Sequence, residues 1–342
     1  MSAPQIAILA TGLVTSVGLG APATCAAMRA KLTNPSATRF IDSNGEPIMA
    51  HQVALQAPWR GIAKLARMAA MAIEECLVDV PKRRWRDIPL LLCVAETDRP
   101  GRPEGLDDLL FAEIESTLGA RFSAASVVVP HGRVAVAVAL AQARAMIHER
   151  QAAQAVVAAV DSLVRWPTLI RYQQQDRLLM TGNSNGFMPG EGAGALRVGK
   201  PTGDALLACT GFGFAMEQAH IESEQPLRAE GLSQAIRAAL AEAGCRMHDM
   251  DLRIADLSGE QYYFKEAALA VSRTLRQRKA EFDIWHPSEC TGEAGAVAGA
   301  AMIALADAAC RKGFSAGPRT LAHMANDDGR RAAVTLHYRA AA

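Results

Sequence analysis

Aromatic residues are scarce in this sequence. Phe, Trp and Tyr make up 5% of its 342 residues, whereas 50% of the residues are hydrophobic. The core must therefore be filled mainly by Ala, Val, Leu, Ile and Met, a composition that suits helices packed against sheets. The length allows one large domain or two ordinary ones.

Cysteines in paired spacings are also missing. The chain has seven cysteines, an odd number, and no two of them have the CxxC spacing of a zinc or redox motif. Several lie in apolar runs, as buried reduced thiols do. This pattern predicts a cytosolic protein with no disulfide, no zinc site and no other cofactor.

Charge of one sign does not dominate any part of the chain. The net charge is +1 and there is no long basic run, so nucleic acid and anionic membranes are poor partners. The first residues lack a basic leader followed by an apolar stretch, so we expect no signal peptide. No apolar run reaches the length of about eighteen residues that a membrane span needs.

The most informative stretch is residues 126–147. It begins as a buried strand, breaks at a turn of Pro130, His131 and Gly132, and continues as a helix rich in Ala and Val. A helix with so few polar residues is buried on nearly every side. Such a strand-to-helix turn often carries a nucleophile or binds an anion, because free backbone N–H groups point outward there. This turn contains neither Cys nor Ser.

A second stretch, CTGEAGAVAGAAMIALADAA at 290–309, echoes the first. The echo has two explanations: an internal repeat, or the general likeness of Ala-rich helices. If the chain is a repeat, two small-residue helices pack together between two sheets. That arrangement gives a five-layer sandwich, helix–sheet–helix–sheet–helix.

The remaining pattern alternates strands with helices, which predicts an α/β fold. Residues 33–58 are polar and predicted to be irregular, and 171–177 are predicted to be a solvated or dimer-covering segment. We expect strands at 5–14, 90–95, 126–129, 155–163, 205–214, 252–258, 284–287 and 332–338, and helices at 62–77, 106–118, 231–243, 263–276 and 292–312.

The chain resembles the β-ketoacyl synthase branch of the thiolase fold over nearly its full length. The most specific match is NSNGFMPGEGAGAL at 183–196, similar to a family loop that ends in GFxxGEGAG. The others are ATGLVTSVGLG at 10–20, VVAAVDSLV at 156–164, EGLSQAIRAALAEAG at 230–244 and CTGEAGAVAGA at 290–300. The resemblance implies a thiolase-like five-layer αβαβα sandwich made of two pseudo-repeated halves, 1–200 and 201–342. It also implies a homodimer formed through the first-half sheet.

The family's catalytic residues are not found at the matching positions. Its nucleophile is a Cys at a helix N-terminus, and two histidines stabilise the anions formed during the reaction. The nucleophile position falls at Gly132 or Arg133, the first histidine at Ser258 and the second at Glu293. We predict an ion pair between Arg133 and Glu293 that fills the former site.

Other residues offer weaker candidates for chemistry. His131 could act as a base or nucleophile, and Cys290 is expected near the same pocket, although acidic neighbours raise a thiol pKa. Asp327 and Asp328 precede Gly329 and could bind a cation or form a turn. The GEGAG string lacks the GK[ST] ending of a phosphate loop, so it is interpreted as a tight-packing motif.

Three hypotheses of function follow, and enzymatic activity stays open between them. The first is a ketosynthase-like protein that has lost condensation chemistry and acts as a binding or adaptor partner, in a secretion-system or biosynthetic gene set, with a secreted effector as one partner. The second is an acyltransferase or 3-oxoacyl synthase that uses His131 or Cys290 on thioesters of acyl-carrier protein or coenzyme A. The third is a non-catalytic subunit that heterodimerises with an active ketosynthase.

Overall fold

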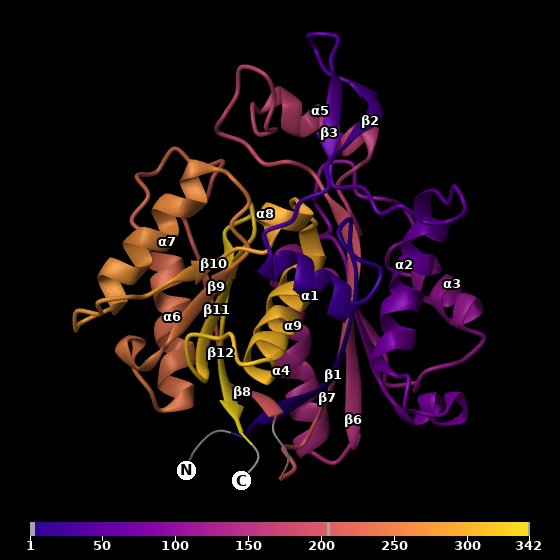
Figure 1. Ribbon diagram of the computed structural model, residues 1–342, viewed down its shortest axis with the longest axis vertical. Helices are drawn as coiled ribbons and strands as arrows, with labels where there is room; N and C mark the ends of the chain where they lie inside the picture. Colours follow the sequence, from indigo (N-terminus) through magenta and orange to yellow (C-terminus); the bar gives the residue numbers. More distant parts are fainter. Residues whose placement is uncertain (1–3, 204–205, 341–342) are drawn as a thin grey trace.

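The protein is a layered α/β sandwich. The computed structural model describes residues 4–203 and 206–340. Figure 1 shows five layers: helices α6 and α7, a first group of strands, the central helices α1, α4 and α9, a second group of strands, and helices α2 and α3. The predicted fold class, a thiolase-like αβαβα sandwich, is confirmed.

The strands form one continuous ten-stranded sheet and a separate hairpin. The sheet order is β10-β9-β11-β12-β8-β1-β7-β6-β4-β5, and β1 joins the two groups by pairing antiparallel with β8 over residues 6–8. The strands are β1 (Ile6–Val14), β4 (Leu90–Cys93), β5 (Val127–Val129), β6 (Gln154–Ser162), β7 (Glu191–Gly199), β8 (Leu206–Met216), β9 (Leu252–Ala255), β10 (Ile284–Trp285), β11 (Arg319–Ala325) and β12 (Arg330–Arg339), with β2 (Ser36–Ile41) and β3 (Pro47–Ala50) in the hairpin.

The helices connect and cover these strands. Short 3₁₀ turns at 82–87, 132–134, 247–249 and 295–297 supplement them. The helices are α1 (Ala21–Arg29), α2 (Gly61–Cys76), α3 (Leu109–Leu118), α4 (Ala135–His148), α5 (Trp166–Gln174), α6 (Glu230–Ala243), α7 (Gln261–Thr274), α8 (Ser288–Thr291) and α9 (Ala298–Arg311). In the described residues no helix has the length and apolar character needed to cross a membrane.

Both groups of strands have the same internal order. If β1, β4, β5, β6 and β7 are numbered 1 to 5 in chain order, their order from the free edge inward is 3-2-4-5-1. Numbering β8 to β12 in the same way gives 3-2-4-5-1 again. On this basis we propose a boundary between the halves near residue 200, between β7 and β8.

Small residues allow the central layer to pack closely. A Cβ added at Gly299 in α9 would lie 2.8 Å from the Cβ of Val136 in α4, and one at Gly194 would lie 2.7 Å from the Cβ of Ala300. A Cβ added at Gly192 would lie only 2.6 Å from the carbonyl oxygen of Val14. The GEGAG string is therefore a tight-packing motif, as predicted, and even the Cβ of an Ala at Gly192 or Gly194 would force its neighbours apart.

Several predicted elements need correction. Residues 33–58 are not irregular throughout, because they contain the β2–β3 hairpin. The single helix predicted over 292–312 is divided: α8 ends at Gly292, which has φ +69°, and α9 begins only at Ala298 after a second turn. The helix predicted from 106 starts at Leu109, with Asp108 as its N-cap. Gly292 and Gly295 interrupt the predicted helix, but in an Ala-rich sequence they gave no sign of a break.

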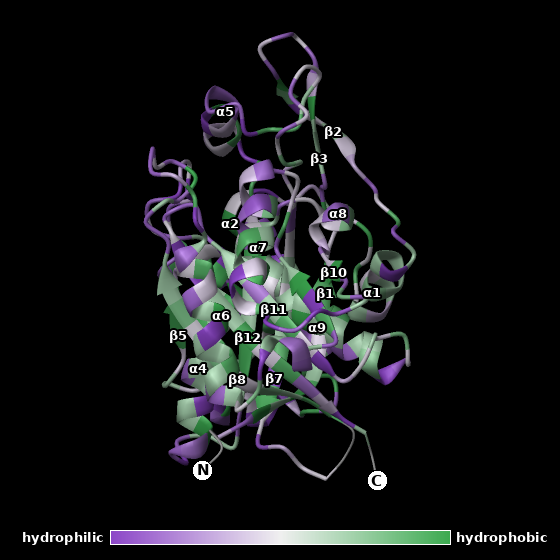
Figure 2. Cartoon of the chain, turned by 90° about the vertical axis from the view of Figure 1, so that its left-hand side faces the viewer, coloured by the Kyte–Doolittle hydropathy of each residue, from purple (hydrophilic) through white to green (hydrophobic). Residues whose placement is uncertain are grey.

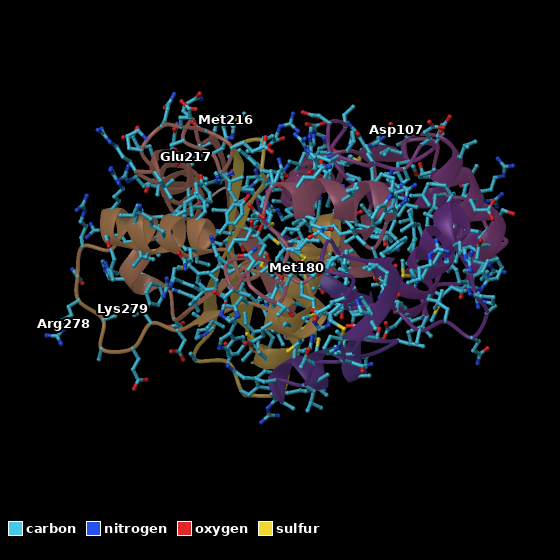
Figure 3. The ribbon with its side chains drawn as sticks, turned by 90° about the horizontal axis from the view of Figure 1, so that it is seen from above. Asp107, Met180, Met216, Glu217, Arg278 and Lys279 are labelled. Carbon is cyan, nitrogen blue, oxygen red and sulfur yellow. The ribbon has the colours of Figure 1, made fainter. Side chains whose placement is uncertain are left out.

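The connection after β6 packs as a cap over one end of the sheet. Helix α5 and the following loop contribute to a buried cluster that includes Leu169, Tyr172, Leu178 and Phe187. From above, Met180 of this loop lies over the centre of the molecule (Figure 3). In Figure 2 the central strands are mostly green, whereas α5 carries much purple. That polar surface explains why sequence reasoning predicted a solvated segment at 171–177.

Candidate functional site

The two halves contain nearly identical turns at the start of a central helix. Gly132 has φ +55° and leads through a 3₁₀ turn into α4, and Gly295 has φ +56° and leads through a 3₁₀ turn into α9. The preceding residues, His131 and Ala294, have φ −120° and −112°, and both helices are 14 residues long. The sequence echo therefore corresponds to a repeated backbone shape rather than to shared composition alone.

Each turn is capped by a side chain from the other half. The N–H of Val134 donates to Asn326 Oδ1 at 3.2 Å, and the N–H of Ala296 donates to Asp161 Oδ2 at 3.0 Å. Asn326 follows β11, whereas Asp161 lies near the end of β6. The turns consequently lie where the halves meet. At each helix start, a backbone N–H group finds its hydrogen-bond acceptor in the other half.

A carboxylate occupies the space beside Gly132. A Cβ at this position would overlap the Glu96 carboxyl group and would lie 3.3 Å from Asn326 Oδ1. Burial raises the pKa of Glu96, and the neighbouring Arg99 guanidinium opposes that shift. Only glycine fits here, because the left-handed φ and the filled space both exclude a side chain.

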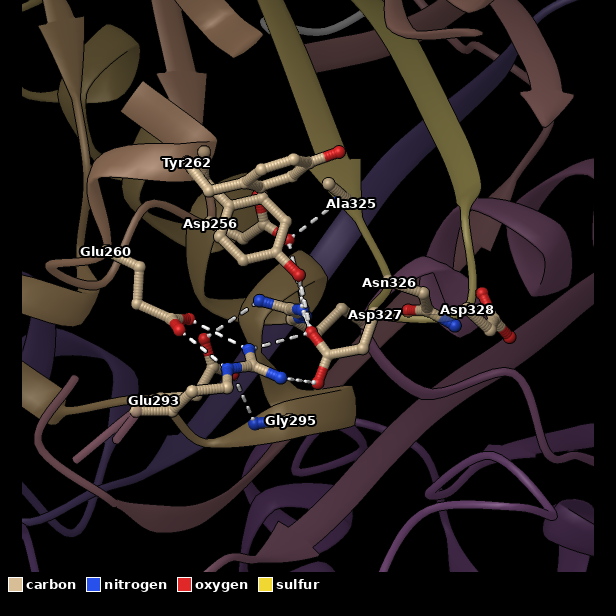
Figure 4. A network of polar contacts seen from close by, with 12 residues as sticks. Asp256, Glu260, Tyr262, Glu293, Gly295, Ala325, Asn326, Asp327 and Asp328 are labelled. Atoms are coloured by element: carbon tan, nitrogen blue, oxygen red, sulfur yellow. Dashed lines mark hydrogen bonds and ion pairs between the residues drawn. The ribbon is translucent and has the colours of Figure 1, made fainter. Parts of the chain in front are cut away.

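Arg133 points into a buried polar network. Its Nη1 donates to Glu293 Oε2 at 3.4 Å, and its Nη2 donates to the Tyr263 hydroxyl at 2.8 Å and to Asp327. Its Nε lies 4.0 Å from Asp256 Oδ2. Figure 4 shows Asp256, Glu260, Glu293 and Asp327 gathered in this network. The predicted Arg133–Glu293 ion pair is confirmed, as one part of a larger network.

A second guanidinium enters the network from the cap. Arg177 forms two hydrogen bonds with Glu260, at 2.7 and 2.9 Å, and two with Asp327, at 2.8 and 3.1 Å. The Tyr172 hydroxyl donates to Asp327 at 3.2 Å. Burial alone would raise the pKa of Asp327, but the guanidinium groups of Arg133 and Arg177 hold it well below its usual range.

Glu293 is a buried carboxyl group of the network with a raised pKa. Its Oε1 accepts from the N–H of Gly295 at 2.9 Å. Burial raises its pKa to about 7; Arg133 opposes the shift, and the neighbouring Asp256 adds to it. Ser258 also faces this carboxylate and favours its charged form. The positions matched to the family's two histidines therefore lie side by side.

Little open space remains among these side chains. The cavity lined by Glu96, Arg133, Arg177, Glu293 and Asp327 measures about 20 Å³. A volume of that size holds roughly one water molecule. An acyl group has no room here while the network is in place.

The two weaker candidates lie outside this network. Burial and the nearby Arg330 lower the pKa of His131, whose Nδ1 is 3.2 Å from the Arg330 guanidinium. Cys290 lines a separate pocket with Trp285 and Phe314, so its predicted place near Arg133 is wrong. Burial raises the pKa of Cys290 to about 11, and Glu289 adds to the shift. A thiol in this state is a poor nucleophile.

Sequence reasoning missed half of the network. Tyr172 and Arg177 lie in the segment predicted to be solvated or to cover a dimer contact, but within this chain they are 4% and 7% exposed. Tyr263 and Glu260 gave no signal, because their partners are far away in the chain. Asp327 binds two guanidinium groups rather than a metal cation, and no group of metal-binding side chains is found in the described part of the chain.

Comparison with known proteins defines the class of this fold. No family model matches the sequence. A stretch of 157 residues is 31% identical to "Putative polyketide beta-ketoacyl synthase 2" of Streptomyces coelicolor; it covers 44% of this chain and 36% of that protein, so the match spans about a third of the relative's length.

Solved structures are similar over nearly the whole chain. A ketosynthase in complex with its chain length factor from Xenorhabdus doucetiae has a TM-score of 0.79 at 13% identity, with 98% of each chain covered. The Streptomyces albus oxazolomycin ketosynthase domain has a TM-score of 0.81 at 14% identity, over 99% of this chain and 76% of that one. The chain thus has the thiolase-like fold of ketosynthases, which agrees with the family resemblance seen in the sequence.

Proposed function

We propose that this chain is a ketosynthase-like protein without condensation chemistry, and that it acts by binding another protein. The observation that carries the proposal is the state of the strand-to-helix turn. Gly132 has no side chain, the Glu96 carboxylate fills the adjacent space, and Arg133 is held by Glu293, Tyr263 and Asp327. Fold similarity alone does not assign an activity.

The chemistry of the residue types supports the loss of condensation. A ketosynthase needs a thiolate to accept the acyl group and donors to stabilise the negative charge that follows. We assign the matching positions to Gly132 or Arg133, Ser258 and Glu293. None of these supplies a thiol or an imidazole. A carboxylate at Glu293 opposes a developing anion, and close like charges in a poorly solvated site cost on the order of several kcal/mol.

Two kinds of protein partner fit the proposal. The solved neighbours include a ketosynthase in complex with its chain length factor, which favours a non-catalytic subunit paired with an active ketosynthase. The resemblance instead implies a homodimer, which would act as an adaptor by binding an unrelated protein. β5 pairs only with β4, so its outer edge is open within the described residues; a partner strand could add there in either case.

Co-purification separates these alternatives. The tagged chain is expressed in its source organism, and the complex is resolved by size-exclusion chromatography and mass spectrometry. A one-to-one complex with a ketosynthase supports the heterodimer, and a homodimer bound to an unrelated protein supports the adaptor. A chain that is monomeric and alone at physiological abundance contradicts the proposal.

The alternative enzyme is tested separately. If His131 or Cys290 carries an acyl group, incubation with acyl-coenzyme A or acyl-carrier protein adds the acyl mass to the intact protein. His131→Ala and Cys290→Ala would then each remove that adduct. We expect no adduct, because the Cys290 thiol is buried and His131 faces a guanidinium group.

A further inference from the structure

A second pocket lies away from the buried network, between the β2–β3 hairpin, the start of α2 and the start of α5. Its volume is about 500 Å³. Figure 1 shows the hairpin and α5 next to each other at the top of the molecule. Ligand sites for small molecules measure roughly 300–1,000 Å³, so this pocket has the size of such a site.

Positive charge in this pocket is not balanced. Its lining includes Arg39, Arg60 and Arg165, and none of the three forms an ion pair with any residue in the described ranges 4–203 and 206–340. The one acidic group in the lining, Glu191, is already bound by Lys64, by the Ser162 hydroxyl at 2.9 Å and by the N–H of Val53 at 2.9 Å.

Arg165 is the most constrained of these cations. It donates to the carbonyl oxygen of Gly101 at 3.1 Å, at the edge of the pocket. Burial and the nearby Arg99 guanidinium lower its pKa, and the Asp161 carboxylate opposes this shift only in part. A bound anion would supply the compensation that is missing.

Aromatic surface lies beside these cations. Trp59 and Trp166, two of the four tryptophans of the chain, are 45% and 42% exposed. These are large fractions, because tryptophan is highly buried on average. Trp166 stacks on Phe40 with the ring centroids 5.9 Å apart, and the Arg39 guanidinium lies 5.1 Å from the Phe40 centroid. Stacked rings with one free face offer a flat apolar surface to a ligand ring.

We propose that this pocket binds a small aromatic anion, in which a flat ring and a carboxylate or phosphate belong to the same molecule. The ring stacks on the exposed indoles of Trp59 and Trp166, and the anionic group is held by Arg39, Arg60 and Arg165. Guanidinium groups recognise both carboxylate and phosphate oxygens by paired hydrogen bonds, so the lining accepts either. This site is independent of the buried network and of the proposed loss of condensation.

Isothermal titration calorimetry on the full chain tests the proposal with naphthoate and naphthyl phosphate, and with naphthol and inorganic phosphate as half-ligands. We expect at least one of the two aromatic anions to bind about tenfold or more tightly than either half-ligand, since ring and charge contribute together. Whether the carboxylate or the phosphate binds better identifies the anionic group. Equal affinity for naphthol, equal affinity for inorganic phosphate, or no binding of either aromatic anion would overturn the proposal.

Variants locate the binding. Trp166→Ala and Arg165→Gln should each weaken binding about tenfold, and Trp166→Phe, which keeps a ring, should restore most of it. Arg276→Gln, on the far half of the protein, is the matched control and should bind like the wild type. Circular dichroism shows whether each variant is folded. Unchanged affinity in folded Trp166→Ala and Arg165→Gln would place the ligand elsewhere and refute this site.

Discussion

Arg133 and Glu293 are 160 residues apart in the chain and form an ion pair of 3.4 Å at the junction of the two halves. Each lies in or next to one of the two matching turns that lead into α4 and α9. The pair ties together the two positions at which the resemblance places a nucleophile and an anion-stabilising histidine. If that alignment holds, a charge network occupies the positions of the catalytic residues of a ketosynthase.

Removing the guanidinium of Arg133 should strongly destabilise the fold. Arg133→Met leaves Glu293, Asp256 and Asp327 with fewer positive partners in a buried site. Breaking a buried pair by removing one partner costs about 3–5 kcal/mol. Urea unfolding of the variant measures this loss, with Arg276→Met as the exposed control. A free energy of unfolding within about 0.5 kcal/mol of the wild type would show that the network contributes nothing to stability.

Glu293 should make stability depend on pH near neutrality. Its pKa is about 7 in the folded protein and about 4.3 in an unfolded chain. The folded state therefore holds a proton that the unfolded state has released in this range. Stability from this group is complete below about pH 4.3 and is lost as the pH rises through about 7.

The Glu293→Gln variant isolates this effect, because Asp256, Glu96 and Glu266 also have raised pKa values. Between about pH 5 and pH 8 the wild type should lose on the order of a few kcal/mol relative to the variant. The measurement is the difference between the two free energies of unfolding at each pH. Parallel pH profiles would contradict the raised pKa of Glu293.

Arg177 should hold the cap in place. It links the connection after α5 to Glu260 and Asp327, across 83 and 150 residues of sequence. Arg177→Met removes four hydrogen bonds to carboxylates, so residues 171–187 should exchange their amide hydrogens faster while β6 and β7 remain protected. Hydrogen exchange detected by mass spectrometry measures this, and uniform protection in the variant would contradict the linkage.

Placing a cysteine at the turn should destabilise the fold. Gly132→Cys places a side chain in the Glu96 carboxylate and forces a left-handed φ on a residue other than glycine, which costs roughly 1–2 kcal/mol by itself. The double variant Gly132→Cys with Glu96→Ala removes the overlap and should regain part of the lost stability. Thermal unfolding compares the two. A single variant as stable as the wild type would show that the space beside Gly132 is open.

Features of the fold that depend on composition and spacing within one segment could be predicted from the sequence. The two Ala-rich helices, the small residues of GEGAG and the order of strands and helices depend on composition and spacing within one segment. The Arg133–Glu293 pair also followed, because the family resemblance aligned both positions with one site.

Other features depend on contacts that no local pattern carries. Tyr172 and Arg177 read as solvated in RYQQQDR, since burial of a polar segment depends on the distant Asp327. The start of α9 at Ala298 was missed because Gly292 and Gly295 look helical among alanines but adopt positive φ. Cys290 was placed too near Arg133, because sequence proximity to Glu293 does not determine on which side of α8 a side chain lies.

The expected cytosolic location and the dimer remain predictions, and localisation by fractionation and analytical ultracentrifugation would test them. All seven cysteines lie in the described residues and are free thiols there. Five of the seven, Cys25, Cys76, Cys93, Cys209 and Cys290, are buried within the two large core clusters.

The most direct test of the central claim is turnover of malonyl thioesters by the purified protein. The assay supplies malonyl-carrier protein with an acyl primer and measures carbon dioxide release and 3-oxoacyl product by mass spectrometry, with an active ketosynthase in parallel. The account predicts no release above the rate without protein, for the wild type and for Arg133→Met alike. Product formed by the wild type and lost on substitution of Arg133, Glu293 or Cys290 would contradict it.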